Sequence, residues 1–300
     1  MNKINEDLKK ILETKKIYEN RSLKEYTSFK VGGKAKVLVE IESVSDLINI
    51  LKYTKEKGIK KYILGAGTNL VFSSDGYDGI IIKIDIKDIE QLENNKIKAG
   101  AGLKLMRLCE YAKEKELGDM SKIYGIPGSI GGCIKMNAGA FGKEMKDYIS
   151  EVIYLDDNLN IQKISNEDID FSYRNSFFKN KDYVILYGIF KLKKENKEKL
   201  EKSMKEIMQK RRDNQPLEYP SAGSVFKRGD GFITSVIIDK LGLKGKSIGD
   251  AEVSKKHAGF IINKGNATSE DIFKLTQEIK KEVKEKEGKI IETEIIFIDK

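Results

Sequence analysis

The stretch Gly125-Ile-Pro-Gly-Ser-Ile-Gly-Gly132, which continues to Asn137-Ala-Gly-Ala-Phe-Gly142, decides the fold class. Glycine permits backbone angles that other residues avoid, so neighbouring N–H groups in such a stretch can converge on an anion. Another glycine-rich stretch, Gly65-Ala-Gly-Thr-Asn-Leu70, follows the apolar run Tyr62 to Leu64. In chain order, 65–70 is the first stretch and 125–142 the second. Each stretch alone is typical of a tight turn. Together they favour binding of the diphosphate of a dinucleotide.

The common nucleotide motifs are absent. A dinucleotide fingerprint that started at Gly65 and Gly67 would need glycine where Leu70 stands. The run Gly245-Lys-Ser247 ends like a phosphate-binding loop, but Lys240 occupies the position of its first glycine. Neither a Rossmann nor a P-loop site is predicted.

Composition indicates a globular chain of two domains. Of the 300 residues, 39% are hydrophobic, 34% are charged and only 3 are proline, which argues against long disordered linkers. No uncharged apolar run approaches the ~20 residues of a membrane span. Residues 1–16 have helical spacing without the apolar core of a signal peptide. We therefore expect no membrane partner and a cytoplasmic location.

Periodicity predicts helices and strands without regular alternation, which is the α+β class. The clearest patterns are a hairpin across Asn94-Asn95 and a helix that starts at a capping box of Thr268 with Asp271 and ends at Gly288. Other elements are predicted at the following ranges: helices over 1–16, 45–57, 103–117 and 193–212, a hairpin of 149–156 with 161–165, and a terminal strand over 290–298.

The rarest residues exclude several kinds of site. The chain has 1 His, His257, and 2 Cys, Cys109 and Cys133. These predict no metal site and no disulfide framework, and Cys133 is expected to be a small packing residue. No G-x-S-x-G elbow accompanies His257. The chemistry should rest on a cofactor, or on carboxylates, arginine, lysine and hydroxyls.

The net charge of +9 comes from 56 Lys+Arg against 47 Asp+Glu. Most of the lysines alternate with glutamate at helical spacing, which is typical of solvated helix faces. A nucleic-acid binder more often gathers its basic residues on one stripe. The charge therefore favours a small anionic substrate, and nucleic-acid binding is not expected.

Seven motifs in order give a specific resemblance. They are Phe29-Lys-Val-Gly-Gly33, Ile63-Leu-Gly-Ala-Gly-Thr-Asn-Leu70, the stretch 125–140, Tyr173-Arg-Asn-Ser176, Ser221-Ala-Gly-Ser-Val-Phe-Lys227, Lys256-His-Ala-Gly-Phe-Ile-Ile-Asn263 and Ile291-Glu-Thr-Glu294. The series resembles the UDP-N-acetylenolpyruvoylglucosamine reductase family over nearly the whole chain past residue 17. Two departures concern backbone shape, because Gly229 and Thr293 stand where the family usually has proline.

The resemblance implies a two-part FAD-binding region of the vanillyl-alcohol-oxidase or PCMH type, followed by a smaller α+β substrate domain. Its limits would be an N-terminal helix over 1–16, an FAD-binding domain over 17–195 with a split near 85, and a C-terminal domain over 196–300. The residues that it assigns to FAD are Gly65, Ala66, Gly67, Thr68, Asn69, Leu70, Gly125, Ile126, Pro127, Gly128, Ser129, Gly132, Asn137, Ala138 and Gly139.

The implied reaction reduces the enolpyruvyl ether of UDP-N-acetylglucosamine to UDP-N-acetylmuramate, a step of peptidoglycan precursor synthesis that serves cell shape and division. NADPH is the implied electron source, and the flavin N5 delivers the hydride. The resemblance makes Arg174 the charge stabiliser, Ser224 the proton donor and Glu294 the partner carboxyl group. It places Tyr173, Lys227 and His257 at the substrate, and we expect a monomer whose only partners are the UDP-sugar and NADPH.

Simpler interpretations stay open at this point. Arg174 could form a surface ion pair, Glu294 could lie in solvent, and Ser224 could be a turn residue. The chain could also be another FAD-dependent oxidoreductase or oxidase of the same superfamily, or a non-enzymatic nucleotide or nucleic-acid binder.

Overall fold

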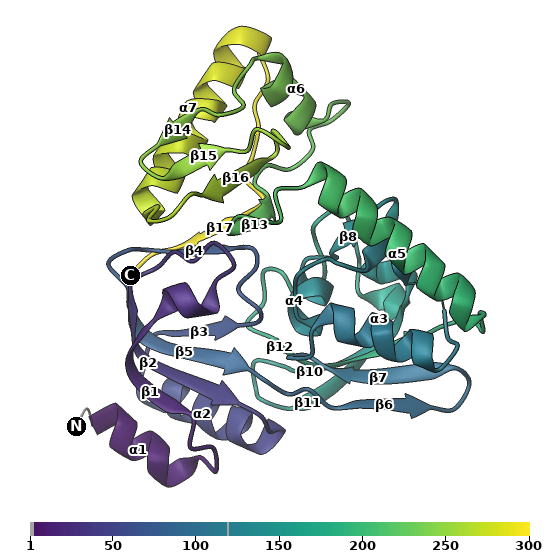
Figure 1. The fold of residues 1–300 in the computed structure, drawn as a ribbon. Helices are drawn as coiled ribbons and strands as arrows, with labels where there is room; N and C mark the ends of the chain where they lie inside the picture. Colours follow the sequence, from purple (N-terminus) through teal and green to yellow (C-terminus); the bar gives the residue numbers. More distant parts are fainter. Residues whose placement is uncertain (1–2, 119) are drawn as a thin grey trace. The chain divides into compact units, whose positions relative to one another are not determined.

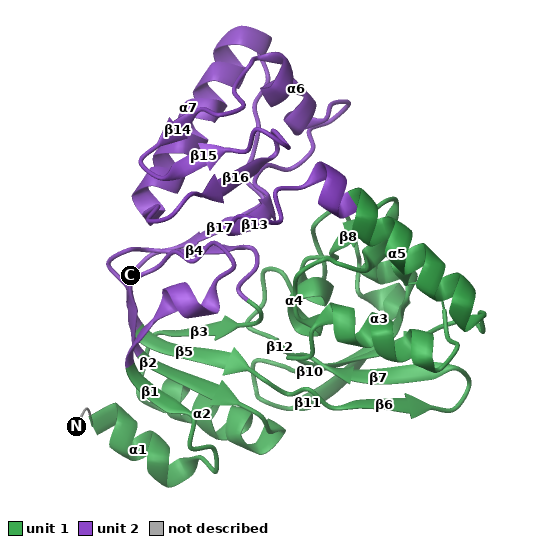
Figure 2. Ribbon diagram, viewed as in Figure 1, with its two compact units in different colours: residues 1–19, 37–66, 79–210 green, residues 20–36, 67–78, 211–300 purple. Residues whose placement is uncertain are grey.

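The computed structural model describes residues 3–118 and 120–300, so residues 1 and 2 of the helix predicted over 1–16 lie outside it. The chain forms two compact units (Figure 2). Unit 1 comprises residues 1–19, 37–66 and 79–210, and unit 2 comprises residues 20–36, 67–78 and 211–300. Each unit has its own hydrophobic core. The domain limits at residues 16, 85 and 195 stay predictions.

Unit 1 contains five helices of the described chain: α1 (Lys3–Ile11), α2 (Val44–Glu56), α3 (Leu105–Glu114), α4 (Ile130–Lys135) and most of α5 (Lys197–Asn214). Its first sheet has the order β1-β2-β5-β3, with β1 (Ile17–Ser22), β2 (Lys34–Ile41), β3 (Lys61–Leu64) and β5 (Tyr77–Ile84). Its second sheet has the order β11-β10-β12-β7-β6, with β6 (Ile89–Leu92), β7 (Lys96–Gly100), β10 (Ile149–Leu155), β11 (Ile161–Ser165) and β12 (Val184–Lys191) (Figure 1). The short pair β8 (Gly139–Ala140) and β9 (Lys143–Glu144) forms a separate hairpin.

The hairpin predicted across Asn94-Asn95 is confirmed as β6 and β7. Asn94 and Asn95 have φ of 58° and 57°, a conformation that asparagine adopts more readily than most residues. The hairpin of β10 and β11 is also confirmed, with Glu151 opposite Ser165. The predicted mixture of helices and strands is therefore the observed α+β class.

Helix α4 packs on the second sheet through small residues. A Cβ added to Gly188 of β12 would lie 2.9 Å from Ile134 Cδ1, and one added to Gly131 would lie 3.0 Å from Ala101 Cβ. Glycine at both positions lets the helix approach the sheet closely. The sequence pattern predicted no helix within this glycine-rich stretch, whereas residues 130–135 form a short helix whose Ile130, Cys133 and Ile134 are buried.

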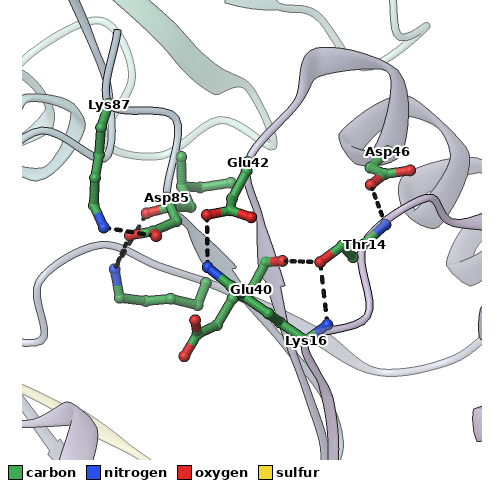
Figure 3. A network of polar contacts seen from close by, with 9 residues as sticks. Thr14, Lys16, Glu40, Glu42, Asp46, Asp85 and Lys87 are labelled. Atoms are coloured by element: carbon green, nitrogen blue, oxygen red, sulfur yellow. Dashed lines mark hydrogen bonds and ion pairs between the residues drawn. The ribbon is translucent and has the colours of Figure 1, made fainter.

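Polar contacts fix the chain between α1 and α2 (Figure 3). The buried carboxylate of Asp46 accepts hydrogen bonds from the backbone N–H groups of Glu13 and Thr14, at 2.8 and 3.0 Å. Lys16 forms an ion pair with Glu42 at 2.6 Å, but this pair is exposed. Exposed pairs contribute little to stability, so the Asp46 contacts are the ones that hold this connection.

Unit 2 contains the sheet β13-β16-β15-β14 and a parallel pair of β17 with β4. Their bounds are β4 (Leu70–Phe72), β13 (Ser221–Ser224), β14 (Ser247–Ile248), β15 (Ala251–Val253), β16 (Phe260–Asn263) and β17 (Ile296–Ile298). Helices α6 (Thr234–Lys240) and α7 (Ser269–Glu287) complete the unit. No helix in the described part of the chain is both long and apolar enough to cross a membrane.

The predicted limits of α7 are confirmed. The Thr268 side chain accepts from the Asp271 N–H, the Asp271 side chain accepts from the Thr268 N–H, and Gly288 ends the helix with φ 64°. The terminal strand predicted over 290–298 is wrong in length, because only β17 pairs as a strand. The preceding residues contact a different segment, through a bridge of Thr293 with Phe226.

We expect Thr268→Ala to lower the free energy of unfolding by about 1 kcal/mol, because the first turn of α7 loses the acceptor for one of its free N–H groups. Equilibrium denaturation with urea measures the effect. Thr268→Ser keeps the hydroxyl and is the matched control. Equal stability of the two variants would show that the capping box contributes nothing.

Candidate functional site

In unit 1, Gly65 at the start of the stretch 65–70 contacts the stretch 125–142. Strand β3 runs parallel to β5 and delivers Gly65 beside Ser129. A Cβ added to Gly65 would lie 2.5 Å from Ser129 Oγ, closer than real atoms approach. A side chain at position 65 would therefore require the Ser129 hydroxyl to move, and the two stretches are neighbours at this point.

The Ser129 hydroxyl is buried without a protein partner. Ser129 is 1% exposed, its Oγ makes no hydrogen bond among the described residues, and it does not cap α4 although it stands at the N-cap position. A buried hydroxyl left unsatisfied costs roughly 1–3 kcal/mol. The site therefore fits a bound oxygen-rich group, such as a diphosphate, that would accept from Ser129 Oγ.

Not all of the second stretch is free to bind a ligand. The N–H groups of Ile130 and Gly131 donate to Leu103 O and Ala101 O at 2.8 and 2.9 Å. Turn residues Gly125 to Gly128 precede the helix, and Gly125 has φ 80°. Ile130 and Gly131 therefore do not offer their N–H groups to a ligand, whereas Gly132 is exposed.

The continuation of this stretch is held by its own side chain. Asn137 is fully buried, and its Nδ2 donates to Glu144 Oε2 and to Ser172 O, both at 3.0 Å. Its Oδ1 accepts from the Lys146 N–H at 3.1 Å. The side chain of Asn137 thus binds protein groups in this structure, and any contact with a cofactor there would come from the backbone.

Arg174 lies in a strained turn of unit 1. Ser172 and Asn175 exchange backbone hydrogen bonds of 3.2 and 3.1 Å across the turn, and Arg174 between them has φ 54°. Its Nη2 donates to Gly139 O at 3.3 Å, and its guanidinium lies 5.0 Å from the ring centroid of Tyr173. A left-handed conformation is costly for a residue with a Cβ, so it indicates a residue that the surroundings hold in place.

In unit 2, the rest of the first stretch is attached to the C-terminal segment. Gly67 has φ 66°, and a Cβ there would collide with Tyr26 O. Asn69 Nδ2 donates to Glu294 O at 3.0 Å, and Asn69 O accepts from the Ile296 N–H at 3.0 Å. The loop assigned to the cofactor and the predicted catalytic carboxyl residue are therefore fixed to each other.

Ser224 and Glu294 lie on neighbouring segments of unit 2. Ser224 is exposed at the end of β13, after Gly223 with φ 73°. Val225 follows, and it donates to Gly259 O at 2.8 Å and accepts from the Glu294 N–H at 2.7 Å. One residue thus joins the strand that carries the predicted proton donor to the segment that carries the carboxyl group.

The two predicted substrate residues of unit 2 have protein partners. Lys227 Nζ forms an ion pair with Glu292 at 2.6 Å. His257 Nδ1 accepts from the Gly259 N–H at 3.0 Å, and its ring meets the edge of Phe260 at 4.9 Å. Burial lowers the pKa of His257, so the ring is neutral at pH 7 and Nε2 carries its proton.

The assigned residues therefore fall into two groups. Unit 1 brings Gly65 to Ser129, and it separately brings Asn137, Gly139 and Tyr173 to the turn of Arg174. Unit 2 brings together Asn69, Ser224, Glu294, Lys227 and His257. Their roles remain predictions.

The sequence motifs did not identify Ser28, which lies beside the predicted cofactor loop. Its N–H donates to Gly67 O at 3.0 Å, and its shielded Oγ makes no hydrogen bond among the described residues. A single serine next to a motif does not indicate a contact with a distant residue. Ser28 comes close to Gly67 only when the chain folds.

The cysteines are not reactive groups in this fold. Cys109 and Cys133 are both buried, and burial raises both thiol pKa values, that of Cys133 to about 12. The thiolate is the reactive form of cysteine, so neither residue is suited to redox chemistry at neutral pH. Within residues 3–118 and 120–300, no group of three or more His, Cys, Asp or Glu is arranged to hold a metal ion.

Comparison with known proteins gives consistent similarities. Residues 35–164 match the sequence pattern of an FAD binding domain, and residues 215–298 match that of the UDP-N-acetylenolpyruvoylglucosamine reductase C-terminal domain. The UDP-N-acetylenolpyruvoylglucosamine reductase of Caldanaerobacter subterraneus subsp. tengcongensis is 45% identical over 97% of this chain and 96% of its own length. That of Clostridium novyi is 40% identical over 98% of this chain and 96% of its own length.

A solved structure agrees with these sequences. UDP-N-acetylenolpyruvylglucosamine reductase from Thermus caldophilus superposes with a TM-score of 0.79 at 30% identity, and covers 92% of this chain and 97% of its own. The prediction of an FAD-binding region followed by a smaller C-terminal domain is confirmed by these matches.

We expect Gly67→Ala to lower the free energy of unfolding by at least about 3 kcal/mol and to reduce the FAD content of the purified protein. The reason is that the new Cβ would displace the Tyr26 carbonyl and force the loop to move. Thermal denaturation and flavin absorbance measure the two effects. Gly58→Ala is the matched control, since Gly58 has φ 60° but no atom within 4 Å of an added Cβ. Equal losses in the two variants would contradict the importance of the contact.

Proposed function

The chain belongs to the UDP-N-acetylenolpyruvoylglucosamine reductase family, and from this premise we propose that it reduces the enolpyruvyl ether of UDP-N-acetylglucosamine to UDP-N-acetylmuramate. The observation that carries the proposal is identity of 45% along 97% of the chain to a relative of that name. Such similarity extends over both units, so it includes the segments that carry Arg174, Ser224 and Glu294.

FAD is the cofactor that the matched binding domain supports. When bound, it supplies the hydride chemistry that no side chain provides. We assign its diphosphate to the residues around Gly65 and Ser129, because the orphaned Ser129 hydroxyl needs an acceptor. The predicted role of residues 66–70 at the cofactor rests on the resemblance of their motif.

NADPH is the proposed electron source. In the net reaction NADPH loses a hydride and becomes NADP⁺, while the double bond of the substrate gains a hydride at its terminal carbon and a proton at the neighbouring carbon. Negative charge accumulates on the neighbouring carbon and its carboxylate before the proton arrives. The residues of the chain must stabilise that charge and deliver that proton.

Arg174 is suited to stabilise the charge. A guanidinium binds a carboxylate through two parallel hydrogen bonds and stays cationic at any working pH. In this structure its Nη2 donates to Gly139 O at 3.3 Å, which places the guanidinium beside the segment that follows Asn137.

Ser224 is the proposed proton donor and Glu294 its partner at the substrate. Serine is a weak acid, but a strongly basic carbon can take its proton where water is excluded. A carboxyl group beside a substrate carboxylate would be favoured in its neutral, hydrogen-bond-donating form. The Val225 contacts hold both residues at adjacent positions, which supports a shared role.

Binding of the substrate is assigned to Tyr173, Lys227 and His257. Lys227 would exchange its exposed partner Glu292 for a phosphate, and neutral His257 would offer an Nε2–H donor. We further propose a cytoplasmic monomer that acts in peptidoglycan precursor synthesis, with the UDP-sugar and NADPH as its only partners.

The function is tested directly with purified protein. We expect bound FAD with its visible absorbance bands, bleaching of those bands by NADPH without oxygen, and their return when the enolpyruvyl ether of UDP-N-acetylglucosamine is added. Mass spectrometry should then show product with two more hydrogens than the substrate. A protein without flavin would contradict the proposal. A flavin that only oxygen reoxidises would instead favour an oxidase.

Ser224→Ala should leave the bleaching of the flavin by NADPH unchanged and lower the rate of substrate reduction by at least about a hundredfold, because the proton donor is lost. Stopped-flow absorbance separates the two half-reactions. Ser247→Ala is the matched control, since Ser247 is an exposed strand residue of the same unit. Equal slowing of both half-reactions in Ser224→Ala would refute its role as proton donor.

A further inference from the structure

We propose that Asn137 is a positioning residue that fixes the turn carrying Arg174, and that it acts through Arg174 rather than on the cofactor. The inference rests on the proposed function, because it assumes that Arg174 binds the substrate carboxylate. It departs from the role that the sequence suggested for Asn137, which was contact with FAD.

The amide of Asn137 has one orientation in this site. Its Nδ2 donates both hydrogens, to Glu144 Oε2 and Ser172 O, and its Oδ1 accepts from the Lys146 N–H. Rotation of the amide by 180° would place a donor against the Lys146 N–H and an oxygen against two acceptors. Since the residue is fully buried, water cannot replace these partners.

Asparagine suits this position better than similar residues. Asn137 has φ 42°, a left-handed conformation that asparagine and glycine adopt more easily than most residues. Aspartate has the same shape, but it would place a carboxylate beside that of Glu144 and an acceptor against Ser172 O. The position therefore requires a short side chain that both donates and accepts.

The segment that starts at Asn137 holds Arg174 at two places. The amide holds the backbone of the turn at Ser172 O, and Gly139 O, two residues later, accepts from the guanidinium. Arg174 lies between these points with φ 54°. A long, flexible side chain is placed accurately only when its backbone is fixed, so the loss of the amide should displace the guanidinium.

The same contacts argue against a direct role at the cofactor. Both donors of Asn137 and one side of its acceptor are occupied by protein groups. A ligand bond to Nδ2 would have to break the contact with Ser172 or Glu144. A cofactor role predicts loss of FAD on substitution, whereas a positioning role predicts loss of substrate reduction with FAD retained.

The test uses Asn137→Gly in the full chain. Glycine tolerates φ 42°, so the variant removes the amide with little backbone strain. We expect unchanged FAD content, unchanged bleaching by NADPH and a ten- to hundredfold slower single-turnover reduction of substrate. Asn95→Gly is the matched control, because Asn95 has φ 57° in the β6–β7 hairpin. It should behave as the unsubstituted protein does.

A double-variant cycle separates positioning from general damage. In an Arg174→Ala background, Asn137→Gly should cause no further loss, because the residue through which it acts is gone. A full further loss would overturn the proposal. Loss of FAD from a folded Asn137→Gly protein would also overturn the proposal.

Limited trypsin digestion gives a readout that needs no turnover. Trypsin cleaves after arginine, so a loosened turn should be cut faster between Arg174 and Asn175 in Asn137→Gly than in the unsubstituted protein or in Asn95→Gly. Mass spectrometry identifies the cut. An unchanged cleavage rate would overturn the inference even if the proposed reaction failed. A failure of the unsubstituted protein to reduce substrate would refute the proposed function alone.

Discussion

The absence of a side chain at Gly67 is the constraint on which the candidate site depends. The Tyr26 carbonyl occupies the space of a Cβ at this position, and φ of 66° lets the chain turn there without strain. That turn brings Asn69 to the carbonyl of Glu294 and Leu70 into register with Ile296. One missing methyl group thus connects a predicted cofactor loop with a predicted catalytic residue that lies over two hundred positions later in the chain.

Neutral amide side chains, rather than charged ones, hold the segments that carry Arg174 and Glu294. Asn137 joins the glycine-rich segment to the Arg174 turn in unit 1. In unit 2, Asn69 holds Glu294, and the buried Asn263 donates to Phe29 O at 3.0 Å. Most of the ion pairs lie on the surface, where they contribute ~1 kcal/mol or less. Buried amides with all their hydrogen bonds made are more directional, and removal of one leaves partners unsatisfied.

The predicted catalytic residues are held in place by backbone contacts. Ser224 is exposed at the end of a strand, and Glu294 is held through its N–H and C=O groups. Arg174 is held through a strained turn. Backbone contacts of this kind fix the Cα positions of these residues, and accurate positioning is what their predicted roles require.

The sequence by itself determined the elements with strong local signals and, through seven motifs in order, the family. The hairpin at Asn94-Asn95 and the capping box of Thr268 with Asp271 follow from residues close together in the chain, so they could be predicted. Tertiary structure alone decided that residues 130–135 form a helix, that the Ser129 hydroxyl has no hydrogen-bond partner in the described part of the chain, that Ser28 contacts Gly67, and that Asn137 reaches Ser172. The physical reason is that these features depend on contacts between segments far apart in the chain. A local sequence pattern does not contain the energies of such contacts.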